Sequence, residues 1–258
     1  MAIQNIHKLN YRVSGNGRPV VFFHGFLESI SMWNYLDEFK NFQCIFIDLP
    51  GHGASMFDNS LPLTMASIAN SVQILIQEMG IASYDVVGHS MGGYVALELK
   101  KADTACDKVV LLNSNFWEDS ESKKMDRRRV AELVQAKKDV FVQAAIPNLF
   151  MNPDKRASEV EALIAEASSI SSETIARSSI AMSERLDNTD LVKENDSVIL
   201  VMQGKHDSIV LCSMMEDRTK GLNLVLSKLD CGHMAHIELG SSVKEIIEEF
   251  IAKKNGNF

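Results

Sequence analysis

Ser90 is the residue of this 258-residue chain best suited to act as a nucleophile. It lies at the centre of a G-x-S-x-G pattern, between Gly88 and Gly92, with an apolar run before it and a helix-forming run after it. Such a pattern predicts a sharp strand-to-helix turn that holds the serine in a strained backbone and exposes its hydroxyl. The glycines are expected because a Cβ at either position would collide with neighbouring backbone. From the motif alone, a plain glycine-containing loop is the alternative.

A serine hydroxyl becomes a strong nucleophile only when a base removes its proton, and a histidine held by a carboxylate suits that task. Asp207 follows an apolar run that ends at Gln203, and His233 lies in a loop a few residues after the last apolar run. Because the carboxyl ends of parallel strands meet at one edge of a sheet, both side chains are expected near Ser90. The candidate roles are nucleophile for Ser90, acid for Asp207 and base for His233.

Three other polar residues follow predicted buried strands and are interpreted as structural. His24 comes directly after the apolar run 20–23, where its ring is expected to hydrogen-bond and shape the loop. Backbone N–H groups of that loop could stabilise a developing negative charge. Asp48 and His52 look like a catalytic pair, but a loop stiffened by Pro50 and two glycines needs hydrogen-bond partners of its own.

The composition narrows the class of protein. The chain is 46% hydrophobic and 23% charged, which is ordinary for a globular protein, and its formal net charge is −8. A negative net charge argues against nonspecific nucleic-acid binding, which needs a basic surface. No run is long and apolar enough to span a bilayer, and residues 1–11 do not resemble a signal peptide. We therefore expect a cytoplasmic protein without a nucleic-acid or membrane partner.

The four cysteines, Cys44, Cys106, Cys212 and Cys231, are scattered without a C-x-x-C pair. Their spacing predicts neither a disulfide scaffold nor a zinc site, and it fits a reducing compartment. The serine chemistry considered above needs no metal ion and no organic cofactor.

Apolar runs that alternate with amphipathic stretches predict an α/β fold, with a mostly parallel central sheet and helices on both faces. Continuous apolar runs indicate buried strands, and alternating runs indicate edge strands. The predicted strands cover residues 3–9, 11–13, 20–23, 44–47, 84–87, 108–112, 197–203 and 223–226. The predicted helices around this sheet cover residues 64–79, 91–101 and 210–220, and a closing helix begins at a capping box formed by Ser242 and Glu245.

The alternation of strands and helices breaks between residues 114 and 188, where the sequence turns helical and polar. Amphipathic stretches at 130–142 and 157–167 are separated by prolines. We interpret this segment as a helical lid over the carboxyl edge of the sheet. The predicted organisation is a core formed by residues 1–113 and 189–258, interrupted by the lid at 114–188.

Together these motifs resemble the α/β-hydrolase superfamily, in particular its single-lid members, which include small carboxylesterases, acyl-carrier methyl esterases and carbon–carbon bond hydrolases. The resemblance covers nearly the whole chain outside the lid. It rests on four motifs in order: His24-Gly25-Phe26, Asp48-Leu49-Pro50-Gly51-His52-Gly53, Gly88-His89-Ser90-Met91-Gly92-Gly93, and Gly204-Lys205-His206-Asp207 with Gly232-His233. It implies Ser90 as nucleophile, Asp207 as acid and His233 as base. It also implies oxyanion donors at the backbone N–H groups of Phe26 and Met91.

The same resemblance indicates which of the competing residues fit the roles of base and acid. His236 fits less well than His233, because the base of the family directly follows a glycine. Asp119 could supply the acid in a variant layout that some members use, but Asp207 has the better local pattern. Haloalkane dehalogenases and epoxide hydrolases of this superfamily carry aspartate at the elbow, so Ser90 disfavours both activities.

The expected activity is hydrolysis of a small-molecule carboxylic ester through an acyl-enzyme intermediate. Two alternatives stay open. One is a lyase that abstracts a proton, like the menaquinone-pathway synthase, which is similar to this chain around residues 22–55. The other is a ligand receptor that keeps the three residues but turns over slowly. The oligomeric state is not predicted.

Two features of the predicted lid bear on the substrate. Its large apolar side chains could line an acyl pocket or simply pack the lid helices together. They are Phe116, Trp117, Phe141, Leu149, Phe150, Met151 and Met182. A basic cluster from Lys123 to Arg129 could recognise a carboxylate or an acyl-carrier-bound substrate, although such a run is more often a solvated helix face.

Overall fold

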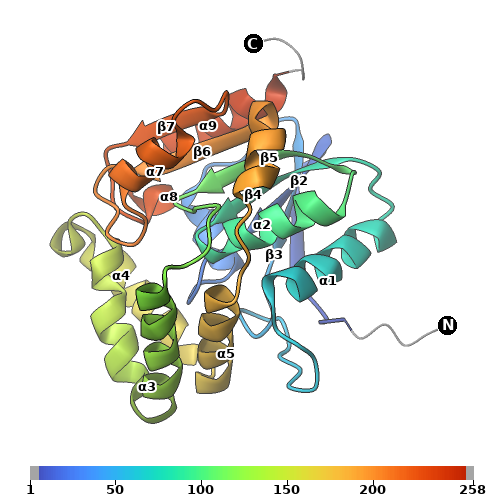
Figure 1. Cartoon of the computed structure of the whole chain (residues 1–258). Helices are drawn as coiled ribbons and strands as arrows, with labels where there is room; N and C mark the ends of the chain where they lie inside the picture. Colours follow the sequence, from blue (N-terminus) through green and yellow to red (C-terminus); the bar gives the residue numbers. More distant parts are fainter. Residues whose placement is uncertain (1–5, 254–258) are drawn as a thin grey trace.

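The computed structural model describes residues 6–253. Seven strands form one sheet in the order β1-β3-β2-β4-β5-β6-β7 (Figure 1). β1 is antiparallel to β3, and the other neighbouring pairs are parallel. The strands are β1 (Tyr11–Ser14), β2 (Arg18–Phe23), β3 (Phe42–Ile47), β4 (Tyr84–His89), β5 (Cys106–Leu112), β6 (Ile199–Gly204) and β7 (Val225–Leu229). The predicted fold class, a mostly parallel sheet with helices on both faces, is confirmed.

The central strands are apolar throughout because both of their faces are covered. Successive side chains of a strand point to opposite faces, so Val21 and Phe23 of β2 belong to one core cluster, whereas Val20 and Phe22 belong to another. The first cluster is covered by α1 (Met65–Glu78) and α2 (Met91–Ala102). The second is covered by the 3-10 helix η1 (Ile30–Tyr35) and by α9 (Gly240–Ala252). This packing holds the carboxyl ends of the parallel strands at one edge.

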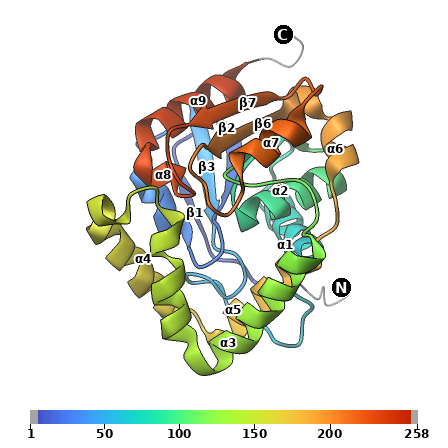
Figure 2. The ribbon, with the colours of Figure 1, turned by 60° about the vertical axis from the view of Figure 1, so that its left-hand side comes forward.

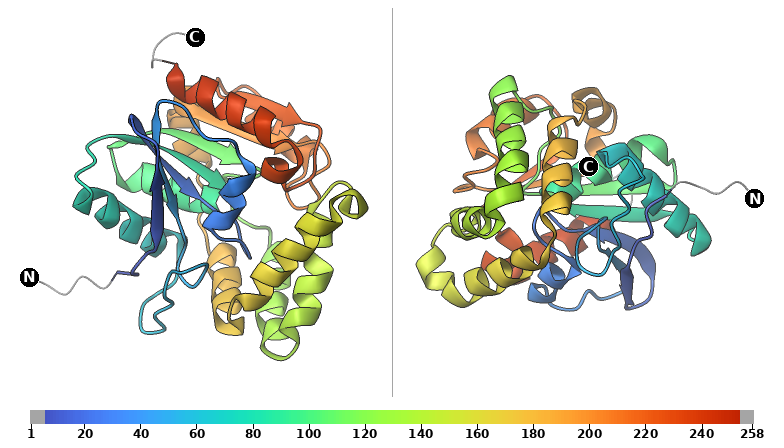
Figure 3. Two further views of the ribbon diagram at one scale, coloured as in Figure 1. Left: turned by 180° about the vertical axis from the view of Figure 1, so that it is seen from behind. Right: turned by 90° about the horizontal axis from the view of Figure 1, so that it is seen from below.

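Three longer helices are inserted between β5 and β6 and lie together beyond one end of the sheet (Figures 2 and 3). They are α3 (Glu121–Ala145), α4 (Ala157–Ser169) and α5 (Ser172–Ser183), separated by the short 3-10 helices η2 (Pro147–Leu149) and η3 (Pro153–Arg156). Their apolar side chains form a third cluster that includes Leu27, Met234 and Ile237. Because Leu27 follows β2 and the other two follow β7, the inserted helices pack over the carboxyl edge of the sheet. Whether they act as a lid, and where the domain boundaries lie, stay predictions.

The remaining elements connect α5 to β6, β6 to β7, and β7 to α9. They are α6 (Thr189–Glu194), η4 (Asp196–Val198), α7 (Cys212–Thr219) and α8 (Ala235–Glu238). Among residues 6–253, no helix has the length and the hydropathy needed to cross a membrane.

Two of the expected elements differ from the structure. Residues 6–10 form no strand, and residues 3–5 of the predicted first strand lie outside the described part of the chain. The predicted capping box at Ser242 is wrong, because α9 begins at Gly240 and has no side-chain cap. The N–H of Val243 donates to the carbonyl of Leu239, the single residue between α8 and α9, so the turn of α8 leads directly into α9.

Candidate active site

Ser90 lies on the turn between β4 and α2, with backbone angles φ 49° and ψ −114°. A positive φ is strained for a residue with a side chain, and here it lifts the partly exposed hydroxyl off the end of the sheet. A Cβ at Gly88 would collide with the backbone of Gly92, and a Cβ at Gly92 would collide with the backbone of Phe23. The predicted reason for both glycines is therefore confirmed.

The side chains of Ser90, His233 and Asp207 form one continuous hydrogen-bonded chain. Ser90 Oγ lies 2.9 Å from Nε2 of His233, and Nδ1 of His233 lies 2.8 Å from Oδ2 of Asp207. The three residues follow β4, β7 and β6, whose carboxyl ends lie on the same edge. His233 and Asp207 are buried, so water competes little for these bonds. The hydroxyl donates to the ring, and the ring donates to the carboxylate.

Asp207 is held by donors on both of its oxygens. Oδ1 accepts from the N–H groups of Ile209 and Val210 at 2.8 and 3.0 Å. Oδ2 accepts from the side-chain amides of Asn113 and Gln203 at 2.9 and 3.0 Å. Burial alone would raise the pKa of Asp207, but the charge of His233 and these hydrogen bonds lower it to about 2. The carboxylate therefore stays ionised at neutral pH.

Asn113 and Gln203 were not among the residues predicted from sequence. Each is a polar residue at the carboxyl end of an otherwise apolar strand run, and this is the signal that could have indicated them. Asn113 also has a left-handed backbone, with φ 46°, which asparagine tolerates better than most residues.

The predicted oxyanion donors lie on the two loops next to Ser90. Met91 begins α2, so its N–H has no residue four positions earlier in the helix to accept it. Phe26 follows β2 on the loop 24–28. Within residues 6–253, neither the N–H of Phe26 nor that of Met91 has a hydrogen-bond partner. The preceding N–H, that of Gly25, donates instead to the side chain of Glu28 at 2.6 Å.

The residues interpreted as structural are confirmed in that role. His24 is fully buried, and its Nε2 accepts from the N–H of Leu49 at 2.8 Å. Asp48 accepts from the N–H groups of Ile30 and Ala54 at 2.8 and 2.9 Å. The ring of His52 bonds to the carbonyl of Pro50 at 3.1 Å rather than to Asp48.

Asp119, the alternative acid, belongs to a different cluster. Its carboxylate forms a salt bridge with Arg127 through Oδ2 and another with Arg185 through Oδ1, the latter over 2.8 Å. Burial alone would raise the pKa of Asp119, but the two guanidinium groups lower it. This ion cluster joins α3 to the segment that follows α5. Among residues 6–253, no hydrogen bond or ion pair links Asp119 to His233.

The residues of the basic cluster at Lys123 to Arg129 lie in two different environments, the protein surface and a cavity. Lys124 pairs with Glu118 and Glu121 on the surface, and Arg129 pairs with Asp126. Arg128 is exposed to solvent. Only Lys123 and Arg127 line a cavity of about 530 Å³, together with Trp117 and Arg218.

Most of the apolar lid residues pack rather than line this cavity. Phe150 is buried in the cluster of the inserted helices, with Phe141 and Leu149 packed against it. Phe116 and Met182 belong to the main core, and only Trp117 also faces the cavity.

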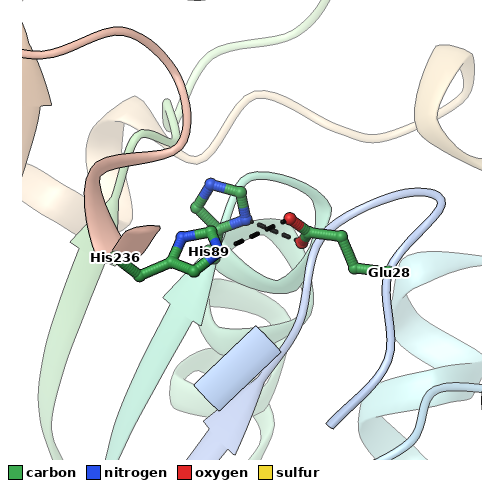
Figure 4. A group of neighbouring side chains, drawn as sticks. All are labelled: Glu28, His89 and His236. Atoms are coloured by element: carbon green, nitrogen blue, oxygen red, sulfur yellow. Dashed lines mark hydrogen bonds and ion pairs between the residues drawn. The ribbon is translucent and has the colours of Figure 1, made fainter. Parts of the chain in front are cut away.

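One group of side chains among residues 6–253 could geometrically hold a metal ion: Glu28, His89 and His236 (Figure 4). Their potential ligand atoms lie within 4.8 Å of one another. Ligand atoms of a tetrahedral zinc site are only about 3.4 Å apart, given zinc–nitrogen bonds of about 2.1 Å. Both ring nitrogens of His89 already make hydrogen bonds. The arrangement therefore fits a hydrogen-bonded network better than a metal site.

Three comparisons place the chain among known proteins. It is 28% identical over 257 residues to the dihydrolipoyllysine-residue acetyltransferase component of the acetoin cleaving system of Cupriavidus necator, covering 93% of this chain and 65% of that component. The chain thus spans less than two thirds of that component's length. It is 27% identical to the 2-succinyl-6-hydroxy-2,4-cyclohexadiene-1-carboxylate synthase of Citrobacter koseri, covering 91% of this chain and 94% of that synthase.

Among solved structures, a thermophilic esterase from Thermogutta terrifontis superposes with a TM-score of 0.85 and 29% identity, covering 95% of this chain and 93% of that one. The family model described as alpha/beta hydrolase fold matches residues 18–238, which is most of the chain. The superfamily to which the motifs pointed is thereby confirmed, and the chain belongs to the alpha/beta hydrolase fold family.

Proposed function

We propose that this protein is a serine hydrolase that cleaves a small carboxylic ester, with Ser90 as nucleophile, His233 as base and Asp207 as acid. One observation carries the proposal: the unbroken hydrogen-bonded chain from Ser90 Oγ through both ring nitrogens of His233 to Asp207, over 2.9 and 2.8 Å. A partly exposed serine on a strained turn, bonded to a buried histidine, is the arrangement that activates a hydroxyl for attack.

The reaction proceeds in two balanced halves. Ser90 Oγ forms a bond to the ester carbonyl carbon while its proton passes to Nε2 of His233, and the resulting imidazolium is stabilised by Asp207. The negative carbonyl oxygen accepts hydrogen bonds from the N–H groups of Phe26 and Met91. The carbon–oxygen bond to the alcohol then breaks, and the alcohol takes the proton from His233. Water repeats the sequence on the acyl-enzyme, releasing the acid and restoring Ser90.

The comparisons support a hydrolase without naming its substrate. The esterase from Thermogutta terrifontis shares 29% identity and nearly the whole fold with this chain. That esterase structure has malate, a dicarboxylate, bound. In this chain, Lys123 and Arg218 line the cavity of about 530 Å³ without an ion-pair partner in the described residues. The carboxylates of Glu118, Asp119 and Asp187 also line this cavity, but the first two already pair with other cations. Lys123 and Arg218 are therefore the cations that a second carboxylate on the acid part of a substrate would meet. Ser90 and His233 do not line the cavity, so such a substrate would extend from Ser90 into it.

The inserted helices act as the lid of this site in our proposal. They pack on Leu27, next to the oxyanion loop, and on Met234, next to the base. A lid in this position limits the size of the substrate that reaches Ser90.

A second candidate activity is proton abstraction by a lyase. It is favoured by the 27% identity to the synthase of Citrobacter koseri over 91% of this chain. The two activities differ in their bonds: the hydrolase forms a bond from Ser90 to a carbonyl carbon, whereas the lyase removes a proton from a substrate carbon while the bond to a leaving group breaks. The test is turnover of carboxylate-rich substrates that eliminate a group without consuming water, compared with simple esters.

The decisive experiment is a panel of p-nitrophenyl esters of increasing acyl length, measured on the wild type, on Ser90→Ala and on Ser60→Ala. Ser60 lies on an exposed loop and serves as the matched control. We expect multiple turnover on short esters by the wild type and by Ser60→Ala, and a loss of about 10³-fold or more for Ser90→Ala. Wild-type turnover by Ser90→Ala would overturn the proposal.

A covalent probe adds an independent result. An organophosphonate is expected to label Ser90, and an adduct mapped to any other residue would contradict the proposed nucleophile. A single burst without further turnover on every ester would favour the receptor alternative.

A further inference from the structure

Behind the three proposed catalytic residues lies a second set of buried polar side chains, which the reaction itself does not use (Figure 4). His89 is the last residue of β4 and directly precedes Ser90. Glu28 comes from the loop after β2 that also carries Phe26, and His236 comes from α8, just after His233. Glu28, His89 and His236 are each at most 1% exposed. One member therefore comes from the loop after β2, one from the end of β4 and one from α8.

Hydrogen bonds connect these loops through His89. Its Nδ1 lies 2.9 Å from Oε2 of Glu28, and its Nε2 lies 3.0 Å from the backbone carbonyl of His233. The same Oε2 of Glu28 accepts from the N–H of Gly25 at 2.6 Å. The oxyanion loop, the nucleophile turn and the loop of the base are thus joined by one side chain.

Counting donors assigns a charge to His89. The carbonyl of His233 can only accept, so Nε2 must carry a proton, and an ionised Glu28 can only accept, so Nδ1 must carry one too. Burial alone would lower the pKa of His89, but the charge and the hydrogen bond of Glu28 raise it. Burial alone would raise the pKa of Glu28, but the charge and the hydrogen bond of His89 lower it to about 2. The pair is an imidazolium and a carboxylate.

The other ionisable groups facing this pair are His24, His236, His233 and Asp207. Burial and the nearby charge of His89 lower the pKa of His236 to about 3, so that ring is neutral at neutral pH. Burial also lowers the pKa of His24. Of the two carboxylates, Asp207 pairs with His233, so Glu28 is the one that balances the charge of His89.

We propose that Glu28 and His89 are positioning residues, a buried ion pair that holds the backbone of His233 and the oxyanion loop in register with Ser90. The proposal rests on the proposed function, because it concerns the same site. A misplacement of about 1 Å at the base or at an oxyanion donor costs about 10²-fold in rate, so rigid support at this point has a kinetic effect.

The molecule contains its own matched control. His236 is as buried as His89, and its ring lies 4.8 Å from that of His89 between centroids. Yet neither ring nitrogen of His236 has a hydrogen-bond partner among the described residues. Nε2 of His236 lies 3.8 Å from Oε1 of Glu28, which is an ion-pair contact but not a hydrogen bond. Replacing His236 therefore perturbs the same region of the core without breaking the hydrogen bonds between the loops.

The two hydrogen bonds of His89 can be separated by substitution. Asparagine places its amide donor near the position of Nδ1, and glutamine places it near that of Nε2. His89→Asn therefore keeps the bond to Glu28 and loses the bond to His233, whereas His89→Gln does the reverse. Glu28→Gln keeps the shape of the side chain but removes its charge.

The test measures kcat and KM for a short p-nitrophenyl ester, normalised to the concentration of sites that react with an organophosphonate. We expect kcat to fall about 10²-fold for His89→Asn and about tenfold for His89→Gln and Glu28→Gln, with KM within about threefold of the wild type. His236→Gln is expected to keep kcat within about threefold of the wild type. Equal losses of kcat for His89→Asn and His236→Gln, or losses in KM alone, would overturn the proposal.

A spectroscopic readout does not depend on the variants being active. Nitrogen-15 NMR of the histidine rings at pH 8 is expected to find both nitrogens of His89 protonated in the wild type and only one protonated in Glu28→Gln. A singly protonated His89 in the wild type would contradict the ion pair. If His89→Asn does not fold, this spectrum and the kinetics of Glu28→Gln decide the question.

Failure of the proposed function and failure of the proposed ion pair give different experimental results. A wild type that hydrolyses no ester contradicts the proposed function alone. In that case the rate at which the organophosphonate labels Ser90 replaces kcat, and the ranking of the four variants still tests the role of Glu28 and His89.

Discussion

Asn113 donates from its side-chain amide to Oδ2 of Asp207 over 2.9 Å, and this oxygen also accepts from His233 over 2.8 Å. The amide of Asn113 thus orients the carboxylate of Asp207, and this carboxylate in turn orients the ring of His233. Gln203 adds a third donor to the same oxygen at 3.0 Å. The orientation of His233 therefore depends on two side chains at the ends of β5 and β6.

Asn113→Gly tests this support without straining the backbone, because glycine adopts the same positive φ. We expect kcat to fall about tenfold to 10²-fold with KM unchanged, since hydrogen bonds to charged groups contribute about 1.5–3 kcal/mol. Steady-state kinetics on a short ester measure this effect. Asn41→Gly is the control. Asn41 also has a positive φ of 64°, but its side chain is exposed to solvent and is not part of the site. Equal effects of both substitutions would show that the amide of Asn113 does not matter.

The two buried aspartates are expected to respond differently to the same substitution. Asp207→Asn should reduce kcat by about 10⁴-fold, because the amide favours the wrong tautomer of His233. Asp119→Asn should mainly reduce stability, by about 3–5 kcal/mol, because it leaves Arg127 and Arg185 without their carboxylate. Ester kinetics and urea unfolding of both variants measure the contrast. A loss of kcat in folded Asp119→Asn as large as that in Asp207→Asn would contradict the assignment of the acid.

Acid is expected to destabilise the fold through its neutral buried histidines. Burial lowers the pKa of His52 and His236 to about 3, assisted at His236 by the positive charge of His89. Unfolded histidines have a pKa of about 6.5. Between pH 6.5 and pH 3 the unfolded chain therefore binds protons that the folded chain does not. The free energy of unfolding consequently decreases as the pH is lowered through this range. Above pH 6.5 both states are neutral at these rings and the effect is absent.

Urea unfolding at a series of pH values from 7 to 4 measures this dependence. Removing one such ring, in His52→Gln, should flatten the slope by up to about 1.4 kcal/mol per pH unit. His206→Gln is the control, because His206 lies on an exposed turn beside Asp230. A slope that is the same in His52→Gln and the wild type would contradict the low pKa of His52.

The two cavity-lining cations without an ion-pair partner, Lys123 and Arg218, lead to a prediction about the charge of the substrate. Lys123 is only partly exposed to solvent, and this burial lowers the pKa of its ammonium group. Lys123→Ala is expected to raise KM about tenfold or more for an ester whose acid part carries a free carboxylate, and to leave KM for a neutral ester unchanged. Lys124→Ala is the control, since Lys124 already pairs with Glu118 and Glu121 on the surface. Unchanged KM for both esters in Lys123→Ala would exclude a substrate carboxylate at this position.

Much of the framework could be predicted from local patterns. Continuous apolar runs such as 20–23 and 44–47 predict buried strands, because only a strand covered on both faces is apolar at every position. The turn at Ser90 is equally local, since Gly88 and Gly92 are required by backbone only a few residues away. The closing helix begins at Gly240, two residues before the predicted start at Ser242, because its start is set by the preceding turn of α8 rather than by a side-chain cap.

The sequence by itself determined the type and order of the chemical groups: a serine on a turn, and an aspartate and a histidine after later strands. Only the tertiary structure decided which polar residues support them. His89 meets Glu28 across 61 residues, and Asn113 meets Asp207 across 94 residues. Spacing along a chain encodes contacts within a helix or strand, whereas these contacts arise from the order in which the parallel strands are arranged in the sheet.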